Sequence, residues 1–493
     1  MTRKLFKDMG KYLPSYIVPS IVSFFSIPII TRLFSPGDYG NYVLVMATVS
    51  VLSAFTTAWI GASVIRFFPV YNKQGGLNEF YSTVIKLAFI SILSVFFILT
   101  GTLVFTREYF LENLYSLLKI GGLVFFISAF FSVLLSTLSA ERKITQYSFF
   151  TIWHSLLGIG LGIILVIVFH FGIVGLLWGQ FLAMVIISPL LYKVAMGKLC
   201  FKYGKIRSAM TKGMIKYGFP IAVVNLATWM LSLSDRYILE FFRGSQEVGL
   251  YSASYAISEK TIFILASIFM MTEGPIAINM WENKTKEINQ EFRSKITRYY
   301  LIVAFPAALG LSVLAKPAIN MLTASGYHSG YIIIPWVAFG SFLVGIDHRF
   351  SYIFGFYKRT DLNMYCVLSA ALLNIGLNII FIPKYGYVAA AITTFISYVF
   401  MLVVVIFVSR RFFIWEFPFK SLGNVVYASG VMGVAVYFIG NSLTSSTLIN
   451  LIVSILTGMS VYSLMLFLLR EIKPSEIEAL KDLKNQFFIR KKL

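Results

Sequence analysis

The sequence predicts an all-α, polytopic membrane protein with about fourteen transmembrane helices. Of its 493 residues, 58% are hydrophobic and only 13% are charged, whereas soluble proteins have about 25% charged residues. The apolar residues also fall into runs of about 20, which is the length that an α-helix needs to cross a bilayer. This composition excludes a water-soluble protein.

Fourteen apolar runs follow one another along the chain, and each predicts one transmembrane helix. We expect these helices at residues 12–31, 41–65, 81–105, 116–139, 148–170, 172–195, 217–239, 248–272, 297–316, 328–355, 361–382, 386–409, 422–441 and 446–469. Most of the 42 basic residues lie in every second connection, beginning with the N-terminal segment. This alternation predicts that both termini are cytoplasmic, and it explains the net charge of +21 without nucleic acid binding.

A weak internal repeat divides the chain after its sixth span. The landmarks that recur are Lys11-Tyr12 with Lys216-Tyr217, and Gly40-Asn41-Tyr42 with Gly249-Leu250-Tyr251. Six spans return the chain to the same side of the membrane, so the repeat predicts two six-helix lobes of the same orientation.

The repeat sets the expected domain organisation. A first lobe (1–195) is followed by a basic cytoplasmic linker (196–216) and a second lobe (217–410). Two additional helices (411–470) then pack at the side, and a cytoplasmic tail (471–493) ends the chain. The apolar spacing in this tail predicts a short amphipathic helix on the membrane surface.

The first outer connection and the start of the second span read PIITRLFSPGDYGNY (residues 28–42). This segment resembles the opening of the Wzx-like polysaccharide-unit flippases, bacterial O-antigen and capsule transporters of the multidrug/oligosaccharidyl-lipid/polysaccharide exporter superfamily. Residues 235–237 and 248–251 resemble elements of that family's second half. The first span carries no charge before Arg32, and in this it departs from the peptidoglycan-precursor flippases, which have an Arg-Asp pair there.

The resemblance implies a fold and an activity. The two lobes would form a V around a central cavity, with two extra C-terminal helices. The protein would move an undecaprenyl-diphosphate-linked oligosaccharide across the membrane by alternating access. The product would be a surface polysaccharide such as O-antigen or capsule.

Charges inside the spans are the first candidates for this function, because they are costly in a membrane and are retained where they meet partners or water. Glu259 and Lys260 lie near the middle of the span at 248–272. Adjacent helical residues point about 100° apart, so we expect that these two do not neutralise each other. Lys260 is then a candidate contact for the diphosphate and Glu259 for ion coupling, or each bridges to a neighbouring helix.

Arg349 and Arg66 lie toward the cytoplasmic ends of their spans and are further candidate contacts for the diphosphate. Arginine suits bidentate binding of phosphate, although Arg349 could instead extend to the lipid headgroups. We expect Arg349 and Lys260 to face one central cavity. Asp347 is a candidate for coupling, and Glu273 is expected to be solvated near the inner surface.

Asp235, Arg236 and Arg32 lie at the outer ends of spans, where gating or pairing between helices is expected. Three amides, Asn374, Asn378 and Gln180, either line the cavity or join helices by hydrogen bonds. The four histidines and two cysteines are scattered, so neither a metal site nor a cofactor is expected.

These features favour a transporter over an enzyme. A cation-coupled multidrug exporter of the same superfamily is the alternative. A membrane polysaccharide polymerase or ligase would need a large outer loop with catalytic residues, and every outer connection here is short.

The surroundings of the protein follow from the same interpretation. No phosphate-binding Walker A motif occurs, so energy would come from an H⁺ or Na⁺ gradient or from consumption of the product. We expect a location in the bacterial cytoplasmic (inner) membrane, with the lipid bilayer and the lipid-linked glycan as partners. Polymerase and chain-length proteins of the pathway are further expected partners.

Overall fold

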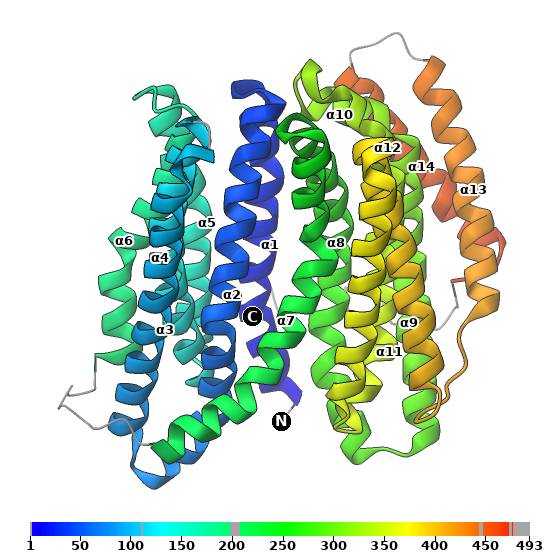
Figure 1. Ribbon diagram of the computed structural model, residues 1–493. Coiled ribbons are helices and arrows are strands. Elements are labelled where there is room, and N and C mark those ends of the chain that lie inside the picture. The colour runs from blue at the N-terminus through cyan, green and yellow to red at the C-terminus, as the bar shows by residue number, and fades with distance from the viewer. Residues whose placement is uncertain (1, 110–111, 198–207, 443–446, 473–475, 477–493) are drawn as a thin grey trace, which may run out of the picture.

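The computed structural model describes residues 2–109, 112–197, 208–442, 447–472 and 476, which form a bundle of long helices (Figure 1). The helices are α1 (Thr2–Leu33), α2 (Pro36–Gln74), α3 (Leu77–Phe105), η1 (Arg107–Tyr109), α4 (Glu112–Ala140), α5 (Ile144–Ile167), α6 (Val174–Met196), α7 (Ser208–Arg243), α8 (Ser245–Asn283), α9 (Lys286–Val313), α10 (Ala315–Leu322), η2 (Ser325–Ile333), α11 (Ile334–Phe356), α12 (Thr360–Ser409), α13 (Phe419–Ser442) and α14 (Thr447–Leu468). The described residues contain no strand, which confirms the all-α class. Linker residues 198–207 and tail residues 473–475 and 477–493 lie outside the described part.

The number of spans agrees with the sequence prediction. In the part of the chain that the structure describes, thirteen helices are long and apolar enough to cross a membrane. Helix α12 covers two of the expected spans. Gly386, which has a φ of 58°, interrupts the helical backbone between them. Two helices run well past the expected ends of their spans, α2 to Gln74 and α8 to Asn283, and α10 is a short helix that the hydropathy did not indicate.

Local signals set several helix ends and bends. The Ser35 side chain caps α2 by accepting a hydrogen bond from the Asp38 N–H at 3.2 Å. Gly75 ends the same helix with a φ of 71°, a left-handed conformation that glycine adopts without strain. Pro220 lies inside α7, which Figure 1 shows bent: its lower part lies beneath the first half of the chain and its upper part joins the second.

The second half of the chain repeats the first at a nearly constant spacing. Helices α2 and α8 begin at Pro36 and Ser245, 209 positions apart, and α3 and α9 begin with the same separation. Further along the chain, equivalent positions are 216 residues apart. Arg142 and Lys358, which both have a left-handed backbone, show this separation just after the ends of the corresponding helices α4 and α11. Positions in the two halves can therefore be paired residue by residue.

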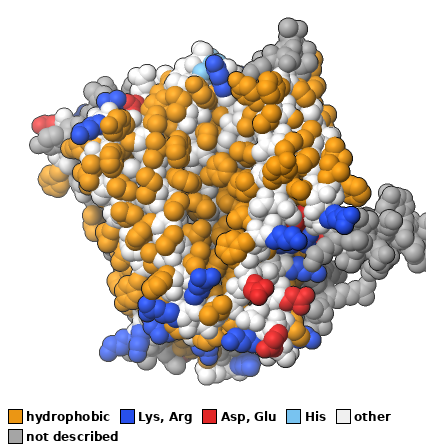
Figure 2. Space-filling model, turned by 90° about the vertical axis from the view of Figure 1, so that its right-hand side faces the viewer, with side chains coloured by type: hydrophobic (Ala, Val, Ile, Leu, Met, Phe, Trp, Pro, Cys, Tyr) orange, Lys and Arg blue, Asp and Glu red, His pale blue; other side chains and the backbone are white. Residues whose placement is uncertain are grey.

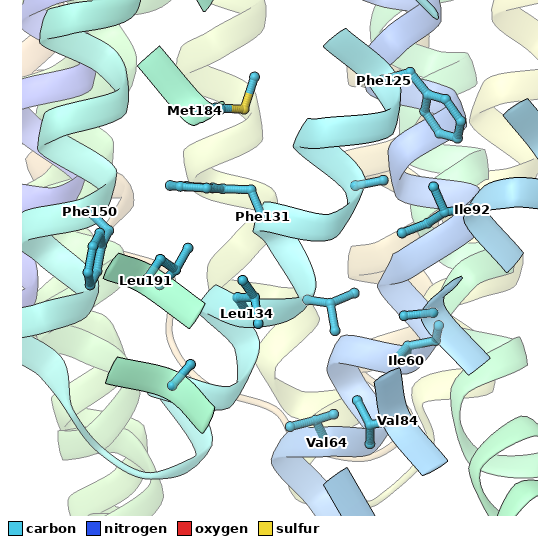
Figure 3. Packing of buried hydrophobic residues seen from close by; sticks show 14 of the residues in the cluster. Ile60, Val64, Val84, Ile92, Phe125, Phe131, Leu134, Phe150, Met184 and Leu191 are labelled. Carbon is cyan, nitrogen blue, oxygen red and sulfur yellow. The ribbon is translucent and has the colours of Figure 1, made fainter. Parts of the chain in front are cut away.

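Each half has its own hydrophobic core. The first core is formed mainly by α2 to α6, and Figure 3 shows the aliphatic side chains of Ile60, Val64, Val84 and Leu134 within it. The second core is formed mainly by α8, α9, α11 and α12. Figure 1 shows α1 to α6 on one side and α8 to α14 on the other.

Helices α13 and α14 lie at the outer flank of the second half, where α13 packs against α9. The segment after α14 is fastened to the same helix, because Arg298 of α9 donates a hydrogen bond of 2.7 Å to Glu471. Although burial raises the pKa of the Glu471 carboxyl, hydrogen bonds from Ser421, Asn424 and Arg298 lower it overall.

The surface of this flank fits a membrane. Figure 2 shows hydrophobic side chains over most of its height and Lys and Arg side chains along its lower edge, the edge near which the N-terminus lies in Figure 1. An apolar band bounded by basic residues is typical of a multi-pass membrane protein.

Candidate functional site

The two halves meet along α2, which packs against both α7 and α8. At one end of this interface the backbones touch through two glycines. A Cβ added to Gly40 would overlap the carbonyl oxygen of Ser245, and one added to Gly249 would overlap the carbonyl oxygen of Pro36. Gly40 and Gly249 are equivalent positions of the repeat, so the contact is nearly symmetric and closes this end.

The opposite end of the interface is closed by α2 and α7. The Ser63 hydroxyl donates a hydrogen bond of 2.9 Å to the Met214 carbonyl. A Cβ on Gly218 would overlap the carbonyl oxygen of Trp59, so here too only glycine permits the approach of the helices.

On another side of the interface lies an apolar groove of about 600 Å³. It is bounded by α1, α8, α9, α13 and α14. Residues from each of these helices line it, among them Phe24, Thr261, Leu265, Ile302, Pro306, Met432 and Tyr462. The groove therefore connects the interface between the halves with the two C-terminal helices.

Glu259 and Lys260 precede Thr261, a residue of the groove wall, on α8. Their side chains are 36% and 32% exposed, and Lys260 Nζ lies 3.8 Å from Glu259 Oε2. The expectation that adjacent residues would not pair was wrong, because the two long side chains bend toward each other from a shared turn. The distance exceeds that of a charge-assisted hydrogen bond, so both groups keep capacity for another partner.

Asp235 and Arg236 are almost completely buried between α7 and α8. Arg236 donates to Asp235 at 3.1 Å, and the Tyr251 hydroxyl also donates to Asp235. The Arg236 guanidinium lies over the rings of Tyr251 and Tyr255, at 5.4 and 4.8 Å. The pair thus joins α7 and α8, the two helices of the second half that pack against α2.

Two other predicted arginines are exposed. Arg32 donates a hydrogen bond of 2.7 Å to the Met321 carbonyl and ties the end of α1 to α10. Arg66 lies on the surface of α2, a few residues beyond Ser63.

Arg349 is completely buried and lies inside the core of the second half. It does not share an open cavity with Lys260 in this structure, contrary to expectation, because Tyr300 and Phe269 enclose it. Glu273 is buried as well, with Arg293 and Arg349 near its carboxylate, so the expectation that it is solvated was wrong. Asp347 accepts a hydrogen bond of 3.0 Å from Ser351.

The three amides are buried between helices. Asn374 donates to Thr394 at 3.3 Å, which links the two segments of α12, and Asn378 donates to Asn374 at 3.0 Å within the first segment. Gln180 packs against Gly158 of α5, where a Cβ would come within 2.7 Å of its amide oxygen. Of the two roles left open, the geometry favours holding helices together.

Sequence reasoning did not single out the close glycine contacts or the groove. Gly40 and Gly249 were visible as repeat landmarks, but hydropathy does not reveal which glycines touch another backbone. The groove had no signal in the sequence, since its lining is as apolar as any lipid-facing surface.

Comparisons with known proteins agree with this architecture. Residues 29–330 match the model of a family described as polysaccharide biosynthesis protein. The chain is 22% identical to the uncharacterized membrane protein MJ1068 of Methanocaldococcus jannaschii, over 96% of this chain and 97% of that protein. It is 20% identical to the probable low-salt glycan biosynthesis flippase Agl15 of Haloferax volcanii, over 55% of this chain and 57% of that protein.

Two solved structures share the fold. The lipid II flippase MurJ in an inward closed conformation has a TM-score of 0.76 at 16% identity, over 93% of this chain and 98% of that chain. An inward-facing multidrug resistance transporter of the MATE family and MOP superfamily has a TM-score of 0.67 at 14% identity, over 81% of this chain and 97% of that chain.

Proposed function

The chain belongs to the polysaccharide biosynthesis protein family, and we propose that it is a flippase for an undecaprenyl-diphosphate-linked oligosaccharide. It is a multi-pass membrane transporter with the MurJ and MATE fold, not an enzyme. The relative in Haloferax volcanii is described as a probable glycan biosynthesis flippase, which supports a lipid-linked glycan as the substrate.

The apolar groove beside Glu259 and Lys260 is the observation that carries the proposal. A polyprenyl chain would lie in the groove while its diphosphate meets Lys260. Lipid tails already provide an apolar medium, so moving a polyprenyl chain from the bilayer into the groove yields little hydrophobic free energy. The groove would therefore select the chain by its shape. Affinity for the headgroup then has to come from charge, which the partly exposed Lys260 supplies.

Movement would follow from the contacts at the two ends of α2. The lobes (1–195 and 217–410) would rock about this helix, separating either the Gly40–Gly249 contact or the Ser63–Met214 contact, while residues 411–470 stay at the flank. Both contacts involve bare backbone and few strong bonds, so either can open without breaking a buried ion pair.

Several further properties belong to the proposal. The location is the bacterial cytoplasmic membrane, with cytoplasmic termini, and the product is O-antigen or capsule. Energy comes from H⁺ or Na⁺ coupling, for which Glu259, Asp347 and Asp235 are candidates, and polymerase and chain-length proteins act next to it. Arg66 and Arg32 would serve at the entry and at the gate.

A cation-coupled multidrug exporter is the second candidate, because the MATE transporter shares the fold. The two functions differ in what a cell accumulates without the protein. Deletion of the gene should leave lipid-linked oligosaccharide intermediates in the membrane if the chain is a flippase. Unchanged lipid-linked pools together with greater drug sensitivity would favour the exporter.

Lys260 provides the residue-level test. We expect Lys260→Arg to retain part of the surface polysaccharide, Lys260→Gln to lose most of it and Lys260→Glu to lose all of it, since an anionic headgroup needs a counter-charge in a low-dielectric site. The measurement is surface polysaccharide in a strain lacking the native copy, at equal membrane levels of each variant. Lys384→Gln, which removes an exposed cation, is the matched control. A wild-type amount of surface polysaccharide from the Lys260→Gln variant would mean that Lys260 does not bind the substrate.

A further inference from the structure

Three charged side chains form a buried cluster in the second core, away from the groove. Glu273 of α8, Arg293 of α9 and Arg349 of α11 are only 1%, 2% and 0% exposed. Arginine keeps its proton in proteins, so two cations and one carboxylate share this space.

The cluster is loosely paired. Arg293 Nη1 lies 3.9 Å from Glu273 Oε1, and Arg349 Nη2 lies 3.8 Å from Glu273 Oε2. These distances are about 1 Å longer than charge-assisted hydrogen bonds. Several buried polar atoms have no hydrogen-bond partner, among them Arg293 Nη2, Arg349 Nε, Arg349 Nη2 and the hydroxyl of Thr297, one turn beyond Arg293. Both carboxylate oxygens of Glu273 also lack a hydrogen-bond partner, so the donors of the two arginines and the carboxylate face one another without close contact.

Neighbouring groups do not supply the missing negative charge. Aromatic rings enclose the arginines: Tyr300 lies 3.9 Å from the Arg349 guanidinium, and Phe356 lies 4.9 Å from that of Arg293. Asp347, although adjacent to Arg349 in sequence, accepts its hydrogen bond from Ser351 instead. The three members of the cluster, Glu273, Arg293 and Arg349, therefore carry one positive charge in excess.

The repeat shows that the fold does not need this cluster. The positions equivalent to Glu273, Arg293 and Arg349 in the first half are Val64, Val84 and Val133, by the spacings of 209 and 216. All three valines are buried in the first core, and Figure 3 shows Val64 beside Val84. Because apolar residues generally replace a buried ion cluster without loss of stability, the charges have a reason other than packing.

We propose that this cluster is a binding site for a monovalent anion of about the size of chloride. The anion would be held by the free N–H groups of Arg293 and Arg349 and by the Thr297 hydroxyl. It would bring the buried charge of the site to zero, which is the condition for keeping ions in a low-dielectric core. The site goes beyond the proposed transport function and does not depend on it.

Thermal unfolding of the purified full chain in detergent tests the site. The probe is chloride, exchanged for gluconate at constant ionic strength. Chloride at a tenfold excess over its Kd should raise the unfolding midpoint of the wild type by about 2 °C, and the rise should saturate. In Arg349→Lys, which keeps the charge but loses the planar fork of donors, the response should need at least about tenfold more chloride.

Two variants serve as controls. The triple variant Glu273→Val, Arg293→Val, Arg349→Val copies the first core and should unfold at a midpoint independent of chloride. Arg410→Met removes an exposed arginine and should keep the wild-type response. An identical midpoint of the wild type in chloride and gluconate would overturn the site, whether or not the triple variant folds. So would a chloride response that persists in the triple variant.

Discussion

At the scale of single residues, Asp235 and Arg236 of α7 are held by each other and by tyrosines of α8. Asp235 accepts hydrogen bonds from Arg236 and Tyr251, and the guanidinium of Arg236 rests on two tyrosine rings. A buried pair of this kind contributes less by its presence than it would cost if one member were left alone. The gating role proposed for these residues therefore depends on their staying paired.

The pair gives a prediction about stability. Asp235→Asn leaves the Arg236 charge buried without a carboxylate and should destabilise the chain by about 3 kcal/mol. The double variant Asp235→Asn, Arg236→Met should recover most of that loss. The unfolding midpoint in detergent, measured for both variants, checks this. Equal midpoints for the single and double variants would mean that the charge is compensated elsewhere.

At the scale of elements, α2 contacts the second half at both of its ends. The contact with the start of α8 depends on Gly40 and Gly249, where even a methyl group would meet a carbonyl oxygen. Any larger residue at these positions forces the two helices apart, whereas Gly37, one turn earlier than Gly40, has ordinary space around it.

We therefore expect Gly249→Ala to shift the protein toward a state in which this end is open. Leu44 lies buried near the contact, and a Leu44→Cys reporter, in a chain without Cys200 and Cys366, should react several-fold faster with a bulky polar thiol reagent once Gly249→Ala is added. Gly37→Ala is the matched control and should leave the labelling rate unchanged. The idea fails if Gly249→Ala, folded and well expressed, labels no faster than its parent.

At the scale of the whole molecule, the basic residues order the chain across the membrane. Figure 2 shows several Lys and Arg side chains along the lower edge of one flank and others near its upper edge. Lysine and arginine in short connections remain on the cytoplasmic side during insertion. This arrangement predicts that both termini face the cytoplasm and that the Gly40–Gly249 contact faces the other side of the membrane.

Reporter fusions check this topology. A fluorescent protein fused after Leu493 should be bright, because that reporter folds in the cytoplasm. Alkaline phosphatase fused after Gly172, in the connection between α5 and α6, should be active, because it needs the outer side. An active phosphatase after Leu493 would contradict the orientation and with it the assignment of the two gates.

The sequence by itself determined the class of protein, the number of spans and the repeat. Hydropathy reports the length of each apolar run, and that length has one structural solution in a bilayer, a helix that satisfies its own backbone. The repeat was legible because landmarks such as Gly40 and Gly249 stand at equivalent positions. The charges inside the spans were also legible, as candidates.

Only the tertiary structure decided what those charges and glycines touch. Glu273 and Arg349 are 76 positions apart in the chain, and no pattern along the sequence reveals that α8 and α11 bring them together. The same holds for the groove, since residues facing a groove and residues facing lipid are equally apolar. Side-chain direction is set by how a helix rotates against its neighbours, and that rotation results from packing among all the helices at once.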